Sequence, residues 1–143
     1  MLRIVSAAIV SAALLVSAQV SSDCARTYTV VAGDFCDKIS AENNASTFQI
    51  ANANPDTINS GCTNLVPDQV ICLGLTGLDC STTTTVAAGT LGTCNDVANA
   101  TGISVETLFH NNPNINSTCG NIYGGEVLCT SAELFDYNTT SSS

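Results

Sequence analysis

The amino-acid sequence predicts an α+β fold made of two small tandem modules of βααβ order, each stapled by two disulfides. Its eight cysteines form two sets of four with almost the same spacing. The second and third cysteines enclose 25 residues in one set and 24 in the other, and the third and fourth enclose nine in both. The sequence between the cysteines also repeats, because NANPDTINSGC in the first set corresponds to HNNPNINSTC in the second. Similarity at a fixed period indicates a duplicated structural unit.

The first module opens with TYTVVAGDFCDKI, residues 27–39, which predicts a strand, a tight turn and a helix. Aromatic and β-branched residues favour the strand. Gly33 tolerates the positive φ that a sharp reversal often needs. Asp34 is predicted to cap the first amides of the helix, on which Cys36 and Ile39 lie three residues apart on one face.

A second helix and a second strand complete this module. Ser46 and Gln49, three residues apart, have the form of a capping box and predict the start of the helix. Pro55 ends the helix, because proline is not tolerated in a helix interior. The second strand is predicted over residues 69–72.

The second module follows the same order. Its second helix is predicted to start at Ser104 and to end at Pro113, and its last strand covers residues 126–129. Apolar residues at helical spacing usually face a core, so we assign three side chains to packing rather than to ligand contact. They are Phe48, Ile50 and Phe109.

An even number of cysteines predicts four disulfides if the chain is secreted. A structural zinc site would need closely spaced ligand pairs such as C-x-x-C, which the sequence lacks. Four cysteines allow three pairings in each module. Antiparallel pairing of the two strands would favour Cys24 with Cys72 and Cys80 with Cys129, which leaves Cys36 with Cys62 and Cys94 with Cys119.

The opening motif resembles the LysM family in its cysteine-bearing fungal form, whose usual text is YTV-x-x-GDTC-x-x-I. The resemblance covers two modules, residues 24–73 and 80–130, joined by a short linker at 74–79. It implies a protein that binds N-acetylglucosamine polymers, chiefly chitin or its oligomers, without catalysis and without a cofactor. Two grooves on one chain would also allow an oligomer to bridge two copies of the protein.

In this family the strand–helix turn and the loop after the second helix form a shallow groove. The resemblance implies sugar contacts from Gly33, Asp34, Phe35, Pro55, Asp56, Thr57 and Ile58 in the first module, and from Gly92, Thr93, Pro113, Asn114, Ile115 and Asn116 in the second. Backbone groups would match the amide of the N-acetyl group. We expect Ile58 and Ile115 to be solvated in the free protein and to cover the methyl group or the sugar face.

Both copies depart from the family motif, and the first groove is favoured because the second copy, two residues longer between Cys80 and Cys94, departs further. Phe35 replaces the usual threonine, so its ring either stacks on a sugar or blocks the groove. The second copy reads VAAGTLGTC and lacks the aspartate, so Thr93 is expected to cap that helix together with Asp96.

Composition excludes other partners. After residue 18 the chain keeps two strong bases, Arg26 and Lys38, against all 12 carboxylates, a formal charge of −10. Such a polyanion repels nucleic acid and anionic lipid. Residues 1–18 have the apolar run and the small residues before the cleavage point that are typical of a signal peptide. The run is short for a bilayer span, so we predict secretion to the extracellular space or cell wall and no membrane association.

No enzyme signature emerges from the sequence. The single histidine, His110, is interpreted as a solvated helix residue. Asp34 and Asp37 lie on one element, whereas a glycosidase needs two carboxylates that flank a cleft. The alternative to sugar binding is a structural or interaction protein of the cell wall whose grooves have degenerated.

Modification and disorder are also predicted. Four N-x-Ser/Thr sequons, at Asn44, Asn99, Asn116 and Asn138, predict a glycoprotein if they are exposed, and Asn116 adjoins the second groove. Residues 131–143 are predicted to form a disordered Ser/Thr-rich tail.

Overall fold

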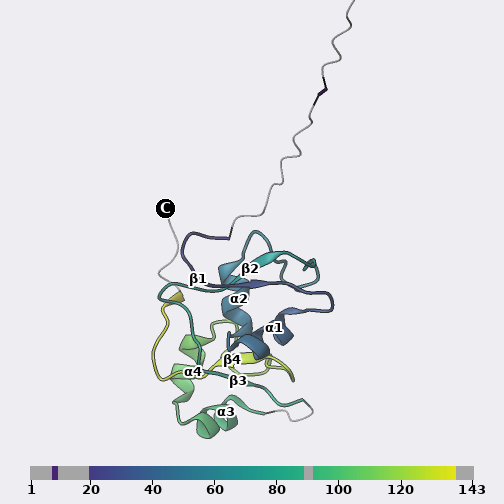
Figure 1. Ribbon diagram of the computed structural model, residues 1–143. Coiled ribbons are helices and arrows are strands. Elements are labelled where there is room, and N and C mark those ends of the chain that lie inside the picture. Colours follow the sequence, from purple (N-terminus) through teal and green to yellow (C-terminus); the bar gives the residue numbers. More distant parts are fainter. Residues whose placement is uncertain (1–7, 10–19, 89–91, 138–143) are drawn as a thin grey trace, which may run out of the picture.

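The computed structural model, which describes residues 8–9, 20–88 and 92–137, contains two βααβ modules (Figure 1). The predicted α+β class is therefore confirmed. The first module consists of β1 (Cys24–Thr29), α1 (Cys36–Asn43), α2 (Thr47–Ala53) and β2 (Val70–Leu75). The second consists of β3 (Thr83–Thr85), α3 (Cys94–Thr101), α4 (Val105–Asn111) and β4 (Val127–Cys129).

Each module holds one antiparallel strand pair, β1 with β2 and β3 with β4. Tyr28 lies opposite Ile71, and Thr84 lies opposite Leu128. The first strand begins earlier than predicted and ends at Thr29, while β2 continues to Leu75 inside the predicted linker. The linker is thus partly sheet.

The helices begin and end largely where the local signals place them. The hydroxyl groups of Ser46 and Ser104 accept hydrogen bonds from the backbone amides of Gln49 and Thr107, so each serine caps its helix. Helix α2 ends two residues before Pro55, and α4 ends at Asn111. These predicted boundaries are confirmed.

Each module has its own apolar core beneath its strand pair. Phe109 packs at the edge of the second core, and Ile50 is fully buried in the first, as predicted. The buried members are Val30, Cys36, Ile39, Ala45, Ile50, Ile58, Ile71 and Leu73 in the first module, and Val86, Cys94, Val97, Ala98, Leu108, Ile115 and Leu128 in the second.

All eight cysteines form disulfides, with the pairing that antiparallel strands favoured. Cys24 pairs with Cys72, Cys36 with Cys62, Cys80 with Cys129, and Cys94 with Cys119. In the first module one bond joins β1 to β2, and in the second module one bond joins Cys80, three residues before β3, to the end of β4. The other bond of each module joins the start of the first helix to the loop after the second helix. Crosslinks that close loops of 25–49 residues stabilise a small domain by about 3.5–4 kcal/mol each in the chain-entropy model.

A buried asparagine explains the repeated Asn-Pro dipeptide. The side-chain amide of Asn54 donates to the carbonyl groups of Ile50 and Cys72, at 2.7 Å each, and its oxygen accepts from the amide of Cys72 at 2.8 Å. Asn112 makes the same three bonds to Leu108 and Cys129. Each asparagine therefore ties the end of its second helix to the last strand of its module.

The two modules pack closely against each other. Figure 1 shows α1 and α2 between the β1–β2 sheet and the β3–β4 pair, and both helices contact β4. The backbone amide of Val127 in β4 donates to the hydroxyl oxygen of Thr47, the first residue of α2, at 3.0 Å. The helices of the first module therefore have a strand pair on each side.

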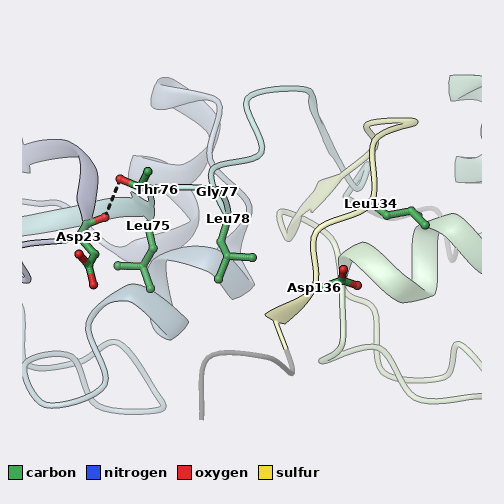
Figure 2. A pocket seen from close by; sticks show the side chains of 7 residues that line it. All are labelled: Asp23, Leu75, Thr76, Gly77, Leu78, Leu134 and Asp136. Carbon is green, nitrogen blue, oxygen red and sulfur yellow. Dashed lines mark hydrogen bonds between the residues drawn. The ribbon is translucent and has the colours of Figure 1, made fainter. Parts of the chain in front are cut away.

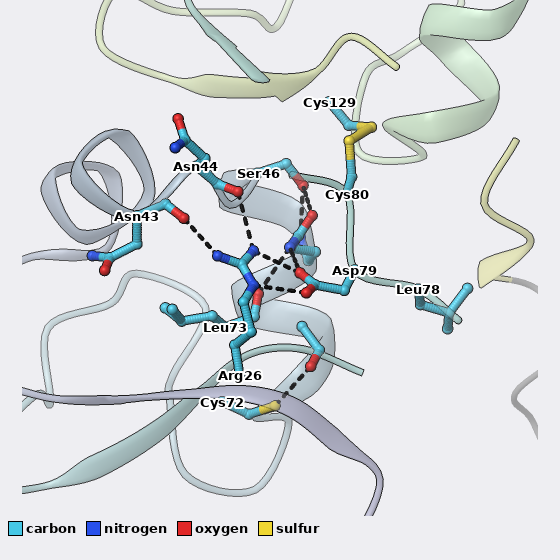
Figure 3. Close-up of polar contacts among 12 residues, drawn as sticks. Arg26, Asn43, Asn44, Ser46, Cys72, Leu73, Leu78, Asp79, Cys80 and Cys129 are labelled. Carbon is cyan, nitrogen blue, oxygen red and sulfur yellow. Dashed lines mark hydrogen bonds and ion pairs between the residues drawn. A yellow bond between two sulfur atoms is a disulfide. The ribbon is translucent and has the colours of Figure 1, made fainter. Parts of the chain in front are cut away.

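Arg26 and Asp79 fix the linker between the modules (Figure 3). The guanidinium group of Arg26 donates to both carboxylate oxygens of Asp79, at 2.6 and 2.7 Å, and also to the carbonyl groups of Asn43 and Asn44 at the end of α1. The side-chain amide of Gln49 reaches the same carboxylate at 3.0 Å. Because Cys80 follows directly and is bonded to Cys129, this network positions the second module on the first.

The predicted disorder of the C-terminal tail is wrong where the structure describes it. Phe135 and Tyr137 are buried, and the ring of Tyr137 meets that of Phe48 edge-on, with centroids 4.9 Å apart. Aromatic pairs prefer this arrangement, so residues 131–137 belong to the folded body. Residues 138–143, with Asn138, lie outside the described residues, as does the predicted leader except at positions 8 and 9. Among the described helices, none is long and apolar enough to cross a bilayer.

Candidate functional site

A pocket of about 170 Å³ lies in the first module, where the start of α1 meets the loop after α2. The Cys36–Cys62 disulfide forms part of its wall. Its lining residues are Phe35, Cys36, Asp37, Thr47, Ala51, Ile58, Asn59, Ser60, Gly61, Cys62 and Tyr123. All of these residues belong to the first module except Tyr123.

Tyr123 reaches the pocket from the second module. Its phenol hydroxyl group donates to Oδ1 of Asp37 at 3.1 Å, and the hydroxyl group of Thr47 donates to the same carboxylate oxygen at 2.8 Å. Burial and the neighbouring Asp37 carboxylate raise the pKa of the Tyr123 phenol above its ordinary value, so the protonated, donating form extends to higher pH. The pocket therefore carries one carboxylate among its lining residues, and two hydroxyl groups already donate to it.

The turn before α1 is held by Asp34, although not as predicted. Its carboxylate accepts from the hydroxyl group of Tyr28, the amide of Val31 and the ammonium group of Lys38, at 2.8, 2.9 and 2.9 Å. The bond from Val31, followed by that from Lys38, lowers the pKa of Asp34 to about 2. Gly33, with φ of 90°, provides the reversal.

Helix α1 consequently begins without a side-chain cap. Its N-cap residue is Phe35, which has no capping side chain, so the predicted capping by Asp34 is wrong. The amide of Cys36 donates instead to the sulfur of Cys62 at 3.1 Å. The carboxylate of Asp34 is instead occupied by donors from β1 (Tyr28), from the turn (Val31) and from α1 (Lys38).

The loop after α2 is ordered by its own asparagines. Oδ1 of Asn59 accepts from the amide of Thr63, and the side chain of Asn64 bonds to the amide of Asn59 and the carbonyl group of Thr57, all at 2.9 Å. Asn116 and Asn121 form the corresponding bonds in the second module. Both loops are therefore preformed.

The expected exposure of Ile58 and Ile115 is wrong. They are 7% and 8% exposed and belong to the two cores. Each follows the end of a helix, and its amide bonds back to the carbonyl group of Asn54 or Asn112, which turns the side chain inward. Packing is therefore the main role of both side chains, although Ile58 also lines the pocket.

The structure brings together only part of the predicted first groove. Phe35, 55% exposed, and Ile58 line the pocket, whereas Gly33, Asp34 and residues 55–57 precede them in the chain and do not line it. Sequence reasoning missed Asp37, Thr47, Ala51, the loop at 59–61 and Tyr123. The favoured Cys36–Cys62 pairing could have indicated residues 59–61, since they precede Cys62. No local signal marks Tyr123.

Comparison with known proteins identifies the modules. The LysM domain family matches residues 28–74 and 92–131, one segment in each module. The chain belongs to the LysM domain family.

Its curated relatives are fungal LysM proteins. They include a non-secreted LysM effector of Penicillium expansum, 32% identical over 80% of this chain and 8% of that protein. A secreted LysM effector of Pochonia chlamydosporia is 31% identical over 78% of this chain and 16% of its own length. The "Secreted LysM effector ldpA" of Aspergillus fumigatus is 28% identical over 76% and 38%. The chain thus spans less than two fifths of the length of these relatives.

The second LysM module presents its predicted groove residues differently. Thr93 caps α3 in a capping box with Asp96, as predicted. The side-chain amide of Asn114 donates to the buried carboxylate of Glu126 at 2.6 Å. Pro113 and Asn116 are exposed, and Gly92 follows residues 89–91, which lie outside the described chain. Burial raises the pKa of Glu126 above its ordinary value.

A larger, open cleft of about 510 Å³ lies between the linker and the C-terminal segment of this LysM protein (Figure 2). None of the predicted groove residues lines it. Its lining residues are Asp23, Leu75, Thr76, Gly77, Leu78, Leu134 and Asp136. Figure 2 shows Leu75 and Leu78 on the linker side and Leu134 and Asp136 on the other.

The candidate acid–base residues have structural partners. The carboxylate of Asp34 is surrounded by three donors, and that of Asp37 accepts from two hydroxyl groups. His110 is exposed on α4, as predicted, and its Nε2 lies 2.8 Å from Oδ1 of Asp136. Each of these three side chains therefore has a partner within the protein.

Proposed function

We propose that this LysM protein is a secreted, non-catalytic protein that binds chitin or oligomers of N-acetylglucosamine. The observation that carries the proposal is the preformed pocket beside the Cys36–Cys62 disulfide, with the exposed ring of Phe35 at its edge. The relatives named secreted LysM effectors support an extracellular role. In that setting the protein would shield wall chitin or sequester chitin fragments.

The chemistry of the pocket suits a neutral sugar. Ligand pockets for drug-sized molecules usually enclose roughly 300–1,000 Å³, so a pocket of about 170 Å³ takes one ring or its N-acetyl arm while the rest of the oligomer lies outside. Ile58 and the disulfide offer an apolar floor for a methyl group. Backbone groups of Ser60 and Gly61, which line the pocket, would offer donors and acceptors for the amide.

Isothermal titration calorimetry with N-acetylglucosamine oligomers of increasing length tests the proposal. We expect affinity to rise with length until the groove is filled, and to change little with salt because no ion pair is screened. Cationic chitosan serves as a comparison, since any binding to this acidic protein should weaken as salt rises. Absence of binding to every oligomer would favour the alternative, a wall protein with degenerate grooves.

Phe35→Ala tests the location of the site. Loss of a stacking ring should weaken binding by about 1 kcal/mol. Leu134→Ala is a matched control, because Leu134 has the same exposed fraction, 55%, but lines the other cleft. Equal affinities of the two variants would place the site elsewhere, and tighter binding by Phe35→Ala would mean that the ring blocks the groove.

The remaining proposals concern the second groove and the surface. The groove at Gly92, Thr93 and residues 113–116 is proposed as a second, weaker site, so that one oligomer can bridge two copies.

Asn44, Asn99 and Asn116 are exposed and are proposed glycan acceptors. Sedimentation velocity with and without oligomer, before and after enzymatic deglycosylation, tests both: deglycosylation should increase the bridged dimer if a glycan on Asn116 obstructs the groove.

A further inference from the structure

We propose that the carbohydrate site of the first LysM module is a two-module site, in which the ring of Tyr123 from the second module forms a wall and contacts the sugar. This inference rests on the proposed function and adds the residue that makes the site depend on how the modules pack. Tyr123 lies 86 positions after Asp37 in the chain but lines the same pocket.

The ring is accessible to a ligand. Tyr123 is 47% exposed and Phe35 is 55% exposed, and both line the one pocket. Sugars present C–H groups on their ring faces, and aromatic side chains offer large apolar area at little entropic cost. Two aromatic residues at one small pocket provide surfaces against which a pyranose ring can pack.

Tyr123 is also held in place by its side chain and by its backbone. Its phenol group donates to Asp37 of α1, and its backbone amide donates to the carboxylate of Glu126 at 3.4 Å. Strand β4 begins directly after Glu126, and its first amide donates to Thr47 of α2. A side chain ordered before binding loses less freedom when the ligand arrives, so this anchoring favours affinity.

The first module shows that the turn before the last strand, which Tyr123 begins in the second module, does not require an aromatic residue. Val66 is the repeat equivalent of Tyr123, and its amide donates to the side chain of Gln69 at 3.1 Å, as that of Tyr123 does to Glu126. Val66 is 56% exposed. Folding of the turn is therefore compatible with valine, and the tyrosine ring is available for the neighbouring pocket.

Calorimetry on the full chain tests the inference, with the hexamer of N-acetylglucosamine as the probe. We expect Tyr123→Ala to weaken binding about 5- to 10-fold, the scale of one aromatic contact. Tyr123→Phe keeps the ring and should lose less, whereas Val66→Ala, the matched change in the first module, should bind as the unaltered protein does. Thermal melting identifies any variant that fails to fold.

A measurement on the unaltered protein makes the test independent of folding. In a two-dimensional NMR titration with the same hexamer, the ring resonances of Tyr123 should shift while those of the buried Tyr137 stay unchanged. If the hexamer binds but neither affinity nor resonances depend on Tyr123, the two-module site is wrong and the proposed function stands. If the hexamer does not bind the unaltered protein, the proposed function itself fails.

Discussion

The phenol oxygen of Tyr123 lies 3.1 Å from Oδ1 of Asp37, so the second LysM module donates a side-chain hydrogen bond to the first. The same carboxylate oxygen accepts from Thr47, whose hydroxyl oxygen in turn accepts from the amide of Val127. These contacts connect β4 to the first turns of both helices of the first module. The interface therefore has a polar chain beside the covalent linker.

Asp37→Ala should destabilise the protein by about 1 kcal/mol, because Thr47 and Tyr123 both lose their acceptor at a partly solvated site. Urea denaturation followed by circular dichroism measures the change. Asp56→Ala, which removes an exposed carboxylate from the loop after α2, is the control and should stay within about 0.5 kcal/mol of the unaltered protein. Equal stability of the two variants would mean that the polar chain contributes nothing to the interface.

Ile58→Ala and Ile115→Ala should each cost about 2–4 kcal/mol of stability, because both side chains are buried in a core and their removal leaves a cavity. Thermal and urea melts provide the measurement. Val66→Ala, at an exposed loop position, is the control. A melting temperature unchanged by the isoleucine variants, together with lost sugar affinity, would show instead that these residues act as surface contacts for the ligand.

Glu126→Gln should stabilise the protein at neutral pH. Burial raises the pKa of Glu126 above its ordinary 4.5, so the folded state holds its proton more tightly than the unfolded state. The free energy of unfolding of the unaltered protein should therefore fall as the pH rises from about 4.5 through the raised pKa. The total loss is about 1.4 kcal/mol for each unit by which the folded-state pKa of Glu126 exceeds the unfolded-state pKa.

The glutamine variant lacks this titration, and the first module already carries Gln69 at the equivalent position. Urea melts of both proteins between pH 4 and pH 7 should diverge as the pH rises. Parallel curves, or a variant that is less stable at pH 7, would mean that the bonds from Asn114 and Tyr123 outweigh the cost of burying the charge.

Asp34→Asn should lower the melting temperature at neutral pH, and most of the difference should be lost by pH 2. The pKa of Asp34 is lowered to about 2 by its bonds from Val31, Lys38 and Tyr28. Its carboxylate therefore contributes stability that is complete above about pH 4 and is lost as the pH falls toward 2. Calorimetric scans at pH 7 and pH 2 measure the effect, with Asp56→Asn as the control. If the full difference in melting temperature persists at pH 2, the effect comes from the geometry of the amide side chain and not from loss of the charge.

Much of each module could be predicted from local sequence. Ser46 and Ser104 cap their helices, Pro55 follows the end of α2, and Gly33 adopts the positive φ of the turn. These signals act within a few residues, so they can be recognised without knowledge of the tertiary structure. Cysteine spacing and antiparallel strands together favoured the observed pairing, because disulfides require a short distance between Cα atoms.

The candidate site was only partly predictable. Phe35 and Ile58 were named for it and line the pocket, but Ile58 does so from the core. Asp34 was assigned to a helix cap and instead bonds to Tyr28, Val31 and Lys38. In both cases the place in the chain was predicted correctly. The direction of the side chain depended on core packing for Ile58 and on three hydrogen-bond donors for Asp34.

By itself, the sequence determined the two modules, the order of their elements and the turns that shape the groove. The tertiary structure alone decided that Tyr123 enters the first pocket, that Arg26 and Asp79 fix the linker, and that Phe135 and Tyr137 pack as part of the body. The reason is that caps, turns and periodicity follow from neighbouring residues. Contacts between residues far apart in the chain depend on how two finished modules pack, and no local pattern records that packing.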